Sequence, residues 1–477
     1  MAEQNNNGMP QASERRRRKP KSKLQLIKEN YLPLGIAALA VLLILVFIIG
    51  SVSRAVAKSK AEKEAALLAS QEAVNEAKRL QEEAQNLLAQ AEALAAEYDF
   101  EAAIDTLNKF SGDTTGFPEL AAKKDAYTQA MAEMVVYQDI SAIPNLSFHM
   151  LVVDPARAYV DEDFASSYRN NFVTVAEFQK ILEQLYNNGY MLVNPRELVT
   201  TTTNDEGKTV YTSKPLYLPA DKKPIILTET NANYYTYMVD GNGDGVADKD
   251  GAGFASKLIV DETGNLANEY VDAQGNIYTG AYDLVPILEA FIAAHPDFSL
   301  RGARATIAVS GYDGLFGHRT NAAAAETLDA NVYQAQVDGA KAVIAALRNA
   351  GYEIACYSYK NTSYSDSSAM EIEADLKKWT DEVTPILGQV DMMVYALNSD
   401  IGDQAAYSGE KFNVLKNTGF SFFFGYSDNA QPWAIVSDDY VRQGRVVVTG
   451  SNLVNNPQYF NNWFDAATVL DPARSVD

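Results

Sequence analysis

The chain has 477 residues, with 40 basic side chains against 62 acidic ones and a formal net charge of −22. Hydrophobic residues make up 47% and charged residues 21%, which excludes a wholly disordered chain. The acidic balance argues against a nucleic-acid partner, because phosphate binding needs a basic surface. The single cysteine, Cys356, excludes an intrachain disulfide. The three histidines (His149, His295 and His318) are too far apart for helical or strand spacing, so a His-based metal site would have to be assembled by the fold.

The N-terminal segment carries the opposite charge from the rest of the chain. Eight basic and three acidic residues give positions 1–30 a charge of +5, so the remainder carries −27. Residues 31–53 contain no charged side chain. At 1.5 Å per residue they reach about 34 Å, enough for a bilayer core of about 30 Å. The basic cluster predicts a cytoplasmic N-terminus and an extracytoplasmic position for everything after Ser53.

A cleaved signal peptide is the alternative interpretation of this segment, since Ala55-Val56-Ala57 resembles a cleavage site. However, the apolar run exceeds the roughly 7–15 residues of a signal peptide's hydrophobic region. Arg54 also interrupts it before the small residues. We therefore favour an uncleaved, single-pass anchor in the cell membrane.

Residues 54–138 are predicted to form a helical stalk. Residues 54–110 contain neither Pro nor Gly and are rich in strong helix formers. Apolar residues recur at the spacings of three and four that are typical of a coiled-coil seam: Ala77, Leu80, Ala84, Leu87, Ala91, Leu94 and Tyr98. A second helix is predicted from Pro118 to about Val136. The seam fits either a helical hairpin packed on itself or a parallel homodimer.

Short apolar strands alternate with amphipathic helices over residues 139–477. We expect strands at Leu146–Val153, Ile225–Thr228, Ala305–Val309, Glu353–Tyr357, Met392–Leu397, Phe420–Phe424 and Val446–Val448. We expect helices at Val175–Asn187, Leu284–Ala294, Val332–Ala350 and Ser368–Leu387. Strand–helix alternation indicates a parallel α/β fold, and about seven strands favour a deformed (β/α)7-type barrel over an open sheet.

Several stretches of this domain resemble the NodB-type polysaccharide deacetylases. The segment from Ile143 to His149 resembles the first strand of that family, and Lys223–Thr228 resembles the second. Gly351–Ala355 resembles the strand that leads into the metal-binding histidines. The segments HPDFSLRGARA, FGHRT and DPAR are similar to a membrane-anchored branch from Firmicutes, which implies a Gram-positive cell envelope. The resemblance covers about residues 143–477.

That family implies metal-assisted hydrolysis of an acetamido group. In it an Asp-Asp pair supplies the general base and a metal ligand, a His-x-x-x-His pair supplies two more ligands, and a later histidine is the general acid. By this resemblance, Thr230 replaces the base, Asn231 replaces the ligand Asp, and Tyr357 and Asn361 replace the two histidines. Neutral oxygens and a phenol of pKa about 10 are poor zinc ligands. We therefore expect no catalytic zinc and a catalytically inactive protein.

The four substituted positions should lie together at the C-terminal ends of the barrel strands, where barrel active sites are assembled. The pocket there should be neutral and hydrogen-bonding. Further candidates for its lining are Glu229, Asn233, Tyr234, Tyr359, Tyr395 and Asn398. Alternation along a strand places Glu229 on the opposite face from Thr230, unless the strand end bends.

A second candidate site lies in an acidic loop. Asp240, Asn242, Asp244 and Asp248 occupy positions 1, 3, 5 and 9 of a calcium-loop pattern, with Gly245 at the sharp turn. Position 12, usually Glu, is Gly251. The loop therefore predicts either a weak calcium site or an acidic surface turn.

Three functions stay open on the sequence alone. The first is a membrane-anchored, inactive deacetylase-like protein that binds or scaffolds a cell-envelope glycan. The second is an active, metal-dependent deacetylase of envelope polysaccharide, which hydrolyses a carbon–nitrogen bond other than a peptide bond with substituted residues. The third is a structural stalk-and-head component of a surface complex.

Overall fold

The computed structural model describes residues 32–474, apart from 161–162, 244–245 and 403. The predicted cytoplasmic tail, residues 1–30, lies outside the described residues. The chain divides into two compact units, the first ending at Glu83 and the second beginning at Ala84.

In its described residues, the first unit is the larger part of one helix. Helix α2 spans Leu32–Ala96, and its residues up to Glu83 belong to this unit. Large apolar side chains between Ile36 and Val56 are exposed. With a mean hydropathy of 2.9 over its most apolar window, this helix is a candidate membrane span by length and composition.

The second unit begins with a small helical cluster. Its members are the last turns of α2, α3 (Phe100–Leu107) and α4 (Pro118–Ala132). Pro118 occupies the first turn of α4, where its missing N–H costs nothing. The buried side chains of the cluster are Ala84, Ala91, Ala103, Leu107, Leu120 and Tyr127. Two positions of the predicted seam, Ala84 and Ala91, are therefore buried against the chain's own helices.

The helix predicted to end near Val136 ends earlier, at Ala132, because the chain extends into β1 (Val135–Tyr137). This strand pairs antiparallel with β6 (Leu216–Leu218).

Seven parallel strands close into a barrel. Around the ring they are β2 (Asn145–His149), β7 (Lys223–Thr230), β11 (Thr306–Val309), β12 (Glu353–Cys356), β13 (Met392–Val394), β14 (Phe422–Tyr426) and β16 (Val441–Val447). Strand β16 pairs with β2 and completes the ring. Each strand overlaps one of the seven predicted strands, so the predicted barrel is confirmed.

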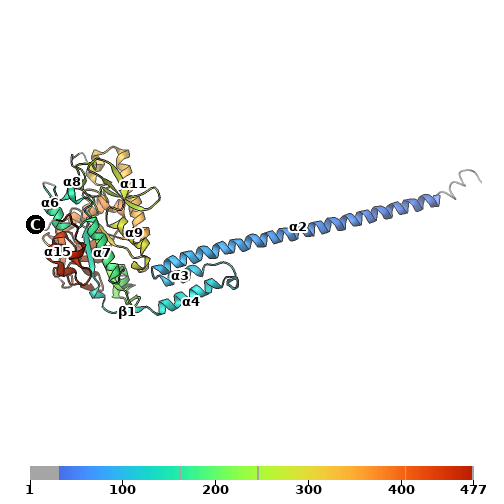
Figure 1. The fold of residues 1–477 in the computed structure, drawn as a ribbon, viewed down its shortest axis with the longest axis horizontal. Coiled ribbons are helices and arrows are strands. Elements are labelled where there is room, and N and C mark those ends of the chain that lie inside the picture. The colour runs from blue at the N-terminus through green and yellow to red at the C-terminus, as the bar shows by residue number, and fades with distance from the viewer. Residues whose placement is uncertain (1–31, 161–162, 244–245, 403, 475–477) are drawn as a thin grey trace, which may run out of the picture. The chain divides into compact units, whose positions relative to one another are not determined.

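Helices surround this barrel (Figure 1). Helices α7 (Val175–Asn187) and α9 (Leu284–Ala294) have the predicted bounds, and α11 (Ala330–Ala350) begins two residues early. Helix α12 (Ala369–Lys378) continues through a π-helical turn at Trp379–Val383 into α13 (Thr384–Leu387). The remaining helices are α5 (Pro155–Ala158), α6 (Ala165–Asn171), α8 (Thr236–Val239), α10 (Ala322–Thr327), α14 (Gly409–Thr418), α15 (Gly450–Asn455) and α16 (Ala466–Val469).

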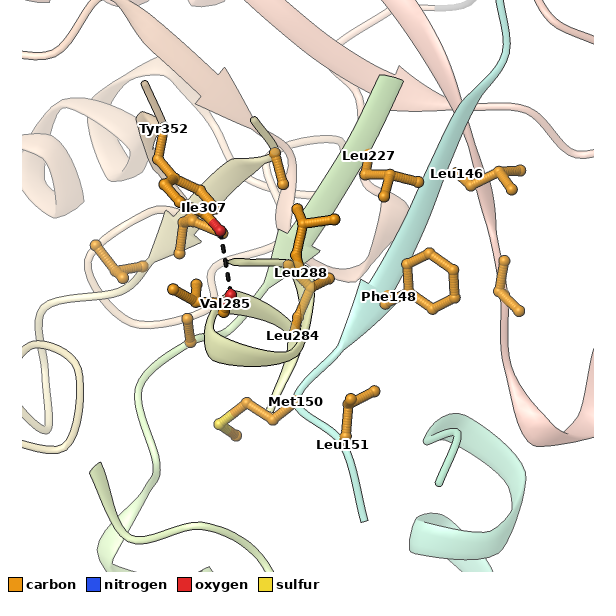
Figure 2. Packing of buried hydrophobic residues seen from close by; sticks show 14 of the residues in the cluster. Leu146, Phe148, Met150, Leu151, Leu227, Leu284, Val285, Leu288, Ile307 and Tyr352 are labelled. Carbon is orange, nitrogen blue, oxygen red and sulfur yellow. Dashed lines mark hydrogen bonds between the residues drawn. The ribbon is translucent and has the colours of Figure 1, made fainter. Parts of the chain in front are cut away.

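Alternation along the strands separates an outer core from an inner one. Outward-facing residues such as Phe148, Leu227 and Ile307 pack against Leu284 and Leu288 of α9 (Figure 2). Inward-facing residues fill the barrel below the C-terminal ends of its strands. They include Ile226, Ala308, Ala355, Val394 and Phe424. The inner and outer sets explain why each strand is apolar on both faces.

Several peripheral strands were not predicted. They are β3 (Tyr190–Leu192), the hairpin β4 (Val199–Thr203) with β5 (Thr209–Ser213), the antiparallel sheet of β8 (Lys257–Val260), β9 (Leu266–Val271) and β10 (Ile277–Gly280), and β15 (Ala434–Val436). Most are short or carry exposed polar side chains, so a hydrophobic pattern does not reveal them.

The C-terminal segment is fixed to α7 by a buried ion pair. Arg474 Nε donates to Glu177 Oε1 at 2.6 Å and Nη2 donates to Oε2 at 2.7 Å. Both side chains are almost completely buried. Glu177 is also part of the capping box that begins α7 at Thr174.

Candidate functional site

Strained backbone is concentrated at the C-terminal ends of the barrel strands. Six non-glycine residues there have left-handed φ values: Asn231 (61°) and Tyr234 (48°) after β7, Ser358 (63°) and Asn361 (51°) after β12, and Leu397 (53°) and Asn398 (56°) after β13. Non-glycine residues seldom adopt this conformation. Where it persists, the surrounding structure holds it, and such residues are concentrated at functional sites. The mouth of the barrel is therefore the candidate site.

Asn231 and Asn361 meet at one phenol. The Tyr235 hydroxyl lies 2.7 Å from Asn231 Oδ1, and Asn361 Nδ2 donates to the same hydroxyl at 3.1 Å. Ser310 Oγ is 2.8 Å away. Burial raises the pKa of Tyr235 well above its ordinary value, so the phenol stays protonated. The fold thus brings together two predicted positions that are 130 residues apart, and their amides bond to a neutral hydroxyl.

Thr230 lies beside His149 at the end of β2. Thr230 Oγ1 is 2.8 Å from His149 Nδ1 and 3.1 Å from the Phe148 carbonyl. Burial and the positive charge of Arg445 lower the pKa of His149 to about 4, so the imidazole is neutral at pH 7. Tyr357 is buried and its oxygen accepts the Leu397 N–H at 3.3 Å.

The barrel interior below the mouth is polar, which the hydrophobic pattern of the sequence does not predict. Asn145 Nδ2 donates to Gln443 Oε1 at 3.1 Å, and Thr228 Oγ1 donates to Asn145 Oδ1 at 2.8 Å. Arg445, the next inward-facing residue of β16 after Gln443, is 1% exposed. Its guanidinium donates to Ser147 Oγ at 3.0 Å. Gln443 and Arg445, the inward-facing residues of the segment RQGR, belong to this polar layer. A segment with so many polar residues lacks the apolar pattern by which a buried strand is predicted.

A cavity of about 460 Å³ lies at the rim of the mouth, beside the C-terminal ends of β13 and β14, and Thr230, Asn231, Tyr357 and Asn361 are not among its lining residues. Its walls include Asn398, Asp400, Gln404, Tyr426, Asp428 and Trp433. Trp433 lies directly over Gly444, where a Cβ atom would be 2.1 Å from the indole Nε1. Asp400 is ion-paired with Arg442 at 2.7 Å. An aromatic ring beside carboxylates and carboxamides gives this cavity both an apolar face and hydrogen-bonding groups.

Glu229 and Tyr234 do not line this cavity, which corrects their place among the predicted pocket residues. Glu229 has no exposed surface and shares its strand face with the outward-pointing Leu227. Burial and Asp283 raise the pKa of Glu229 well above its usual value. The Tyr234 hydroxyl accepts from Asn268 Nδ2 at 3.1 Å, and its phenol also interacts with Asp283. These groups form a buried acid cluster outside the barrel.

Three other predicted pocket residues also have different partners. Asn233 ties two loops together, because its carboxamide bonds the Ser310 N–H at 2.8 Å and the Gly314 carbonyl at 2.6 Å. The Tyr359 hydroxyl donates to Glu382 at 2.8 Å. Tyr395 packs in the outer core. Of the six predicted lining residues, only Asn398 borders the cavity.

The residues at the mouth do not fit the zinc that the family resemblance implies. The Asn231 and Asn361 side chains offer neutral amides that already bond to Tyr235. Over the described ranges, no three His, Cys, Asp or Glu side chains gather closely enough to hold a metal ion. We therefore derive no metal-dependent step at this site.

The acidic loop is described only in part, because Asp244 lies outside the described residues. Asp240 Oδ1 accepts the N–H groups of Asn242 at 3.0 Å and Gly243 at 2.6 Å. Asp248 Oδ1 accepts the Asp250 N–H at 2.8 Å. These bonds form local turns, and the calcium site stays a prediction.

No family model and no curated protein sequence matches this chain. A comparison with solved structures found two to which this chain is similar at 13% sequence identity each. One is the Streptococcus pyogenes deacetylase PplD in complex with acetate, aligned over 67% of this chain and 95% of PplD with a TM-score of 0.34. The other is a de-N-acetylase from Aggregatibacter actinomycetemcomitans, aligned over 65% of this chain and 95% of that protein with a TM-score of 0.32. Likeness at this level does not bear on the chemistry of the site.

Proposed function

We propose that this chain is a membrane-anchored, extracytoplasmic, polysaccharide-deacetylase-like protein whose barrel binds a cell-envelope glycan without hydrolysing it. The observation that carries the proposal is the Tyr235 hydroxyl, which joins Asn231 and Asn361. By resemblance these two positions belong to the metal-ligand set, yet here they hold neutral amides bonded to a protonated phenol.

The neighbouring groups also lack the means to activate water. Thr230 offers a hydroxyl, whose proton leaves only at very high pH. His149 is a weak base because its pKa is lowered to about 4. The nearest carboxyl on β7, Glu229, belongs to the outer face and is driven toward its neutral form. A general base of the family's kind is thus missing from the described part of the mouth.

The cavity at the mouth suits a sugar. Sugars present apolar C–H faces to aromatic rings and hydroxyls to carboxylates and amides, and Trp433, Tyr426, Asp428 and Gln404 supply these groups. Its volume of about 460 Å³ is in the usual range for small-molecule sites.

The remaining parts of the proposal concern placement. Residues 31–53 would cross the cell membrane, with residues 1–30 in the cytoplasm, 54–138 as a stalk and 139–477 as the outer domain. The candidate span in α2 and the charge change from +5 to −27 across it support this. The proposal includes a homodimer along the stalk. Ala77, on the predicted coiled-coil seam, is exposed and could pack against a second copy of the helix.

The test uses the full-length protein in detergent micelles with two probes, N-acetylated chitotetraose and peptidoglycan glycan strands. We expect saturable binding of at least one probe by thermophoresis and no acetate release from either. Trp433→Ala should weaken binding at least tenfold, while Trp379→Phe, in the outer core, should leave it unchanged. Acetate release would support the active deacetylase instead. Absence of binding would favour the structural component.

A further inference from the structure

The barrel encloses a guanidinium that has no ion-pair partner among the described residues. Three arginine side chains are almost completely buried: Arg442, Arg445 and Arg474. Arg442 pairs with Asp400 at 2.7 Å and Arg474 pairs with Glu177 at 2.6 Å. The hydrogen bonds of Arg445 instead end on neutral oxygens: Ser147 Oγ, the Gly425 and Tyr395 carbonyls, and Asn398 Oδ1.

A buried charge without a counter-charge is strongly unfavourable, because the interior cannot replace the water that the ion has lost. Burial accordingly lowers the pKa of Arg445, and the nearby Asp400 carboxylate, which is already ion-paired with Arg442, offsets this only in part. An arginine nevertheless stays protonated in proteins. The positive charge is therefore retained inside the barrel, and an anion that reached it would gain both the charge attraction and a planar set of N–H donors.

The cover between Arg445 and the cavity is thin and strained. It includes Asn398, which contacts both, and the preceding Leu397; both residues are left-handed, and Leu397 is 67% exposed. Asn398 Oδ1 makes the longest bond of the set, 3.4 Å from Arg445 Nη2, and Asn398 also borders the cavity. This neutral oxygen stands in the place that an anionic oxygen would occupy with a shorter, charge-assisted bond.

We infer that the barrel mouth binds the carboxylate or phosphate group of an acidic glycan, with Arg445 as its counter-charge and the Leu397–Asn398 turn as the segment that yields to it. The inference rests on the proposed function, since it names the class of glycan that the same mouth selects. A neutral sugar would fill the cavity but leave Arg445 without a direct ion-pair partner among the described residues.

The acidic surroundings do not cancel this preference. The chain after residue 30 carries −27, which repels an anion at long range. At physiological salt, however, exposed charges are screened beyond a Debye length of about 8 Å. Arg445 acts at hydrogen-bonding distance in a dry interior, where screening is weak. The acidic surface should therefore slow association more than it weakens the bound state.

The experiment compares four probes on the full-length protein in detergent micelles: a hyaluronan tetrasaccharide, which carries uronic carboxylates, neutral chitotetraose, inorganic phosphate and acetate. The wild type should bind the acidic tetrasaccharide at least tenfold more tightly than chitotetraose. Arg445→Met should abolish that preference while the melting temperature stays at or above the wild-type value, because a buried charge is removed. Lys360→Met, an exposed cation, is the matched control.

A second measurement keeps the inference testable if Arg445→Met does not fold. Phosphate or acetate should raise the melting temperature of the wild type above that in sodium chloride of equal ionic strength, and at least as much in Asn398→Ala. No rise in either protein, or an unchanged glycan preference in a folded Arg445→Met variant, overturns the inference. Equal binding of both tetrasaccharides overturns it while leaving the proposed function intact. Binding of neither glycan contradicts the proposed function, and the anion-induced rise then decides the inference alone.

Discussion

At the candidate site, the sequence predicted which residues lie close together but not the Tyr235 hydroxyl that joins them. The resemblance of the strand ends placed Asn231 and Asn361 near each other, and both bond to the Tyr235 hydroxyl. The sequence analysis did not assign that hydroxyl a role. The position of this hydroxyl depends on the left-handed backbone at Asn231. The strand ends there, so the alternation of side chains between the two faces no longer predicts where a side chain points.

Glu229 illustrates the complementary case. The period of two predicted that it faces away from Thr230, and the structure confirms this. Its neighbour Asp283 is 54 residues further along, at the N-cap of α9, so a local pattern could not reveal the pair. Two carboxyl groups in one buried cluster cannot both be charged, so the cluster retains a proton.

This buried pair predicts a pH dependence. Burial raises the pKa of Asp283 from 3.8 to about 6, and the pKa of Glu229 is raised further above its ordinary value. For acids with raised folded-state pKa values, the stabilisation is complete below pH about 4 and is lost as pH rises through 6. Glu229→Gln should reduce this loss, with about 1–3 kcal/mol less difference in unfolding free energy between pH 5 and 7.5, because one titrating carboxyl is removed while Asp283 stays buried.

Denaturant unfolding at several pH values measures the effect. The control is Glu326→Gln, on an exposed helix, which should follow the wild type. His149 and His318, with pKa values lowered to about 4, act in the opposite direction, so the comparison must be the difference between variants. Parallel pH curves for Glu229→Gln and the wild type would show that the pair carries no extra proton.

At the scale of elements, the pattern of apolar residues predicted the barrel strands but not the strand segments that carry polar side chains. Helices α7 and α9 have the predicted bounds because their cores repeat at helical spacing. Strand β16 was predicted at Val446–Val448 but begins at Val441, since Arg442, Gln443 and Arg445 concealed it. Gln443 and Arg445 bond to Asn145 and Ser147 on β2, which only the closed ring brings close.

The C-terminal ion pair predicts a large stability effect. Arg474→Ala would leave Glu177 charged and buried without its partner, at a cost of about 3–5 kcal/mol. Lys377→Ala, which removes an exposed pair with Asp381, should cost less than about 1 kcal/mol. Urea unfolding compares the two. A loss below about 1 kcal/mol in Arg474→Ala would mean that the C-terminal segment does not hold α7.

The acidic loop gives a prediction for calcium. If Asp240, Asn242, Asp244 and Asp248 converge on an ion, millimolar calcium should raise the melting temperature, because the ion binds only the folded protein. Asp244→Ala should abolish the rise. Magnesium at the same concentration is the control for ionic strength. A melting curve that calcium leaves unchanged would identify the loop as an acidic turn.

At the scale of the whole molecule, charge and hydropathy predict the topology. The apolar part of α2 follows a basic tail and precedes an acidic remainder. Protease added to intact protoplasts should therefore digest residues 54–477 and spare the N-terminal tail. Antibodies against tags at either end follow the two parts. Protection of the C-terminal tag in intact protoplasts, with digestion only after lysis, would reverse the orientation.

We propose that the barrel lies outside the membrane and that its mouth binds a ligand. The architecture of such a mouth could be predicted from strand order, because parallel barrels bring their C-terminal strand ends together. Its hydrogen bonds could not, because they join residues as far apart in the sequence as Tyr235 and Asn361, which are separated by 126 positions.

The most direct test of this account is the metal content of the purified full-length protein, measured by mass spectrometry after expression with added zinc. The wild type should contain far less than one zinc, nickel or cobalt ion per chain. The variant Thr230→Asp, Asn231→Asp, Tyr357→His, Asn361→His should gain about one. Stoichiometric metal in the wild-type protein would contradict the account and support an active deacetylase.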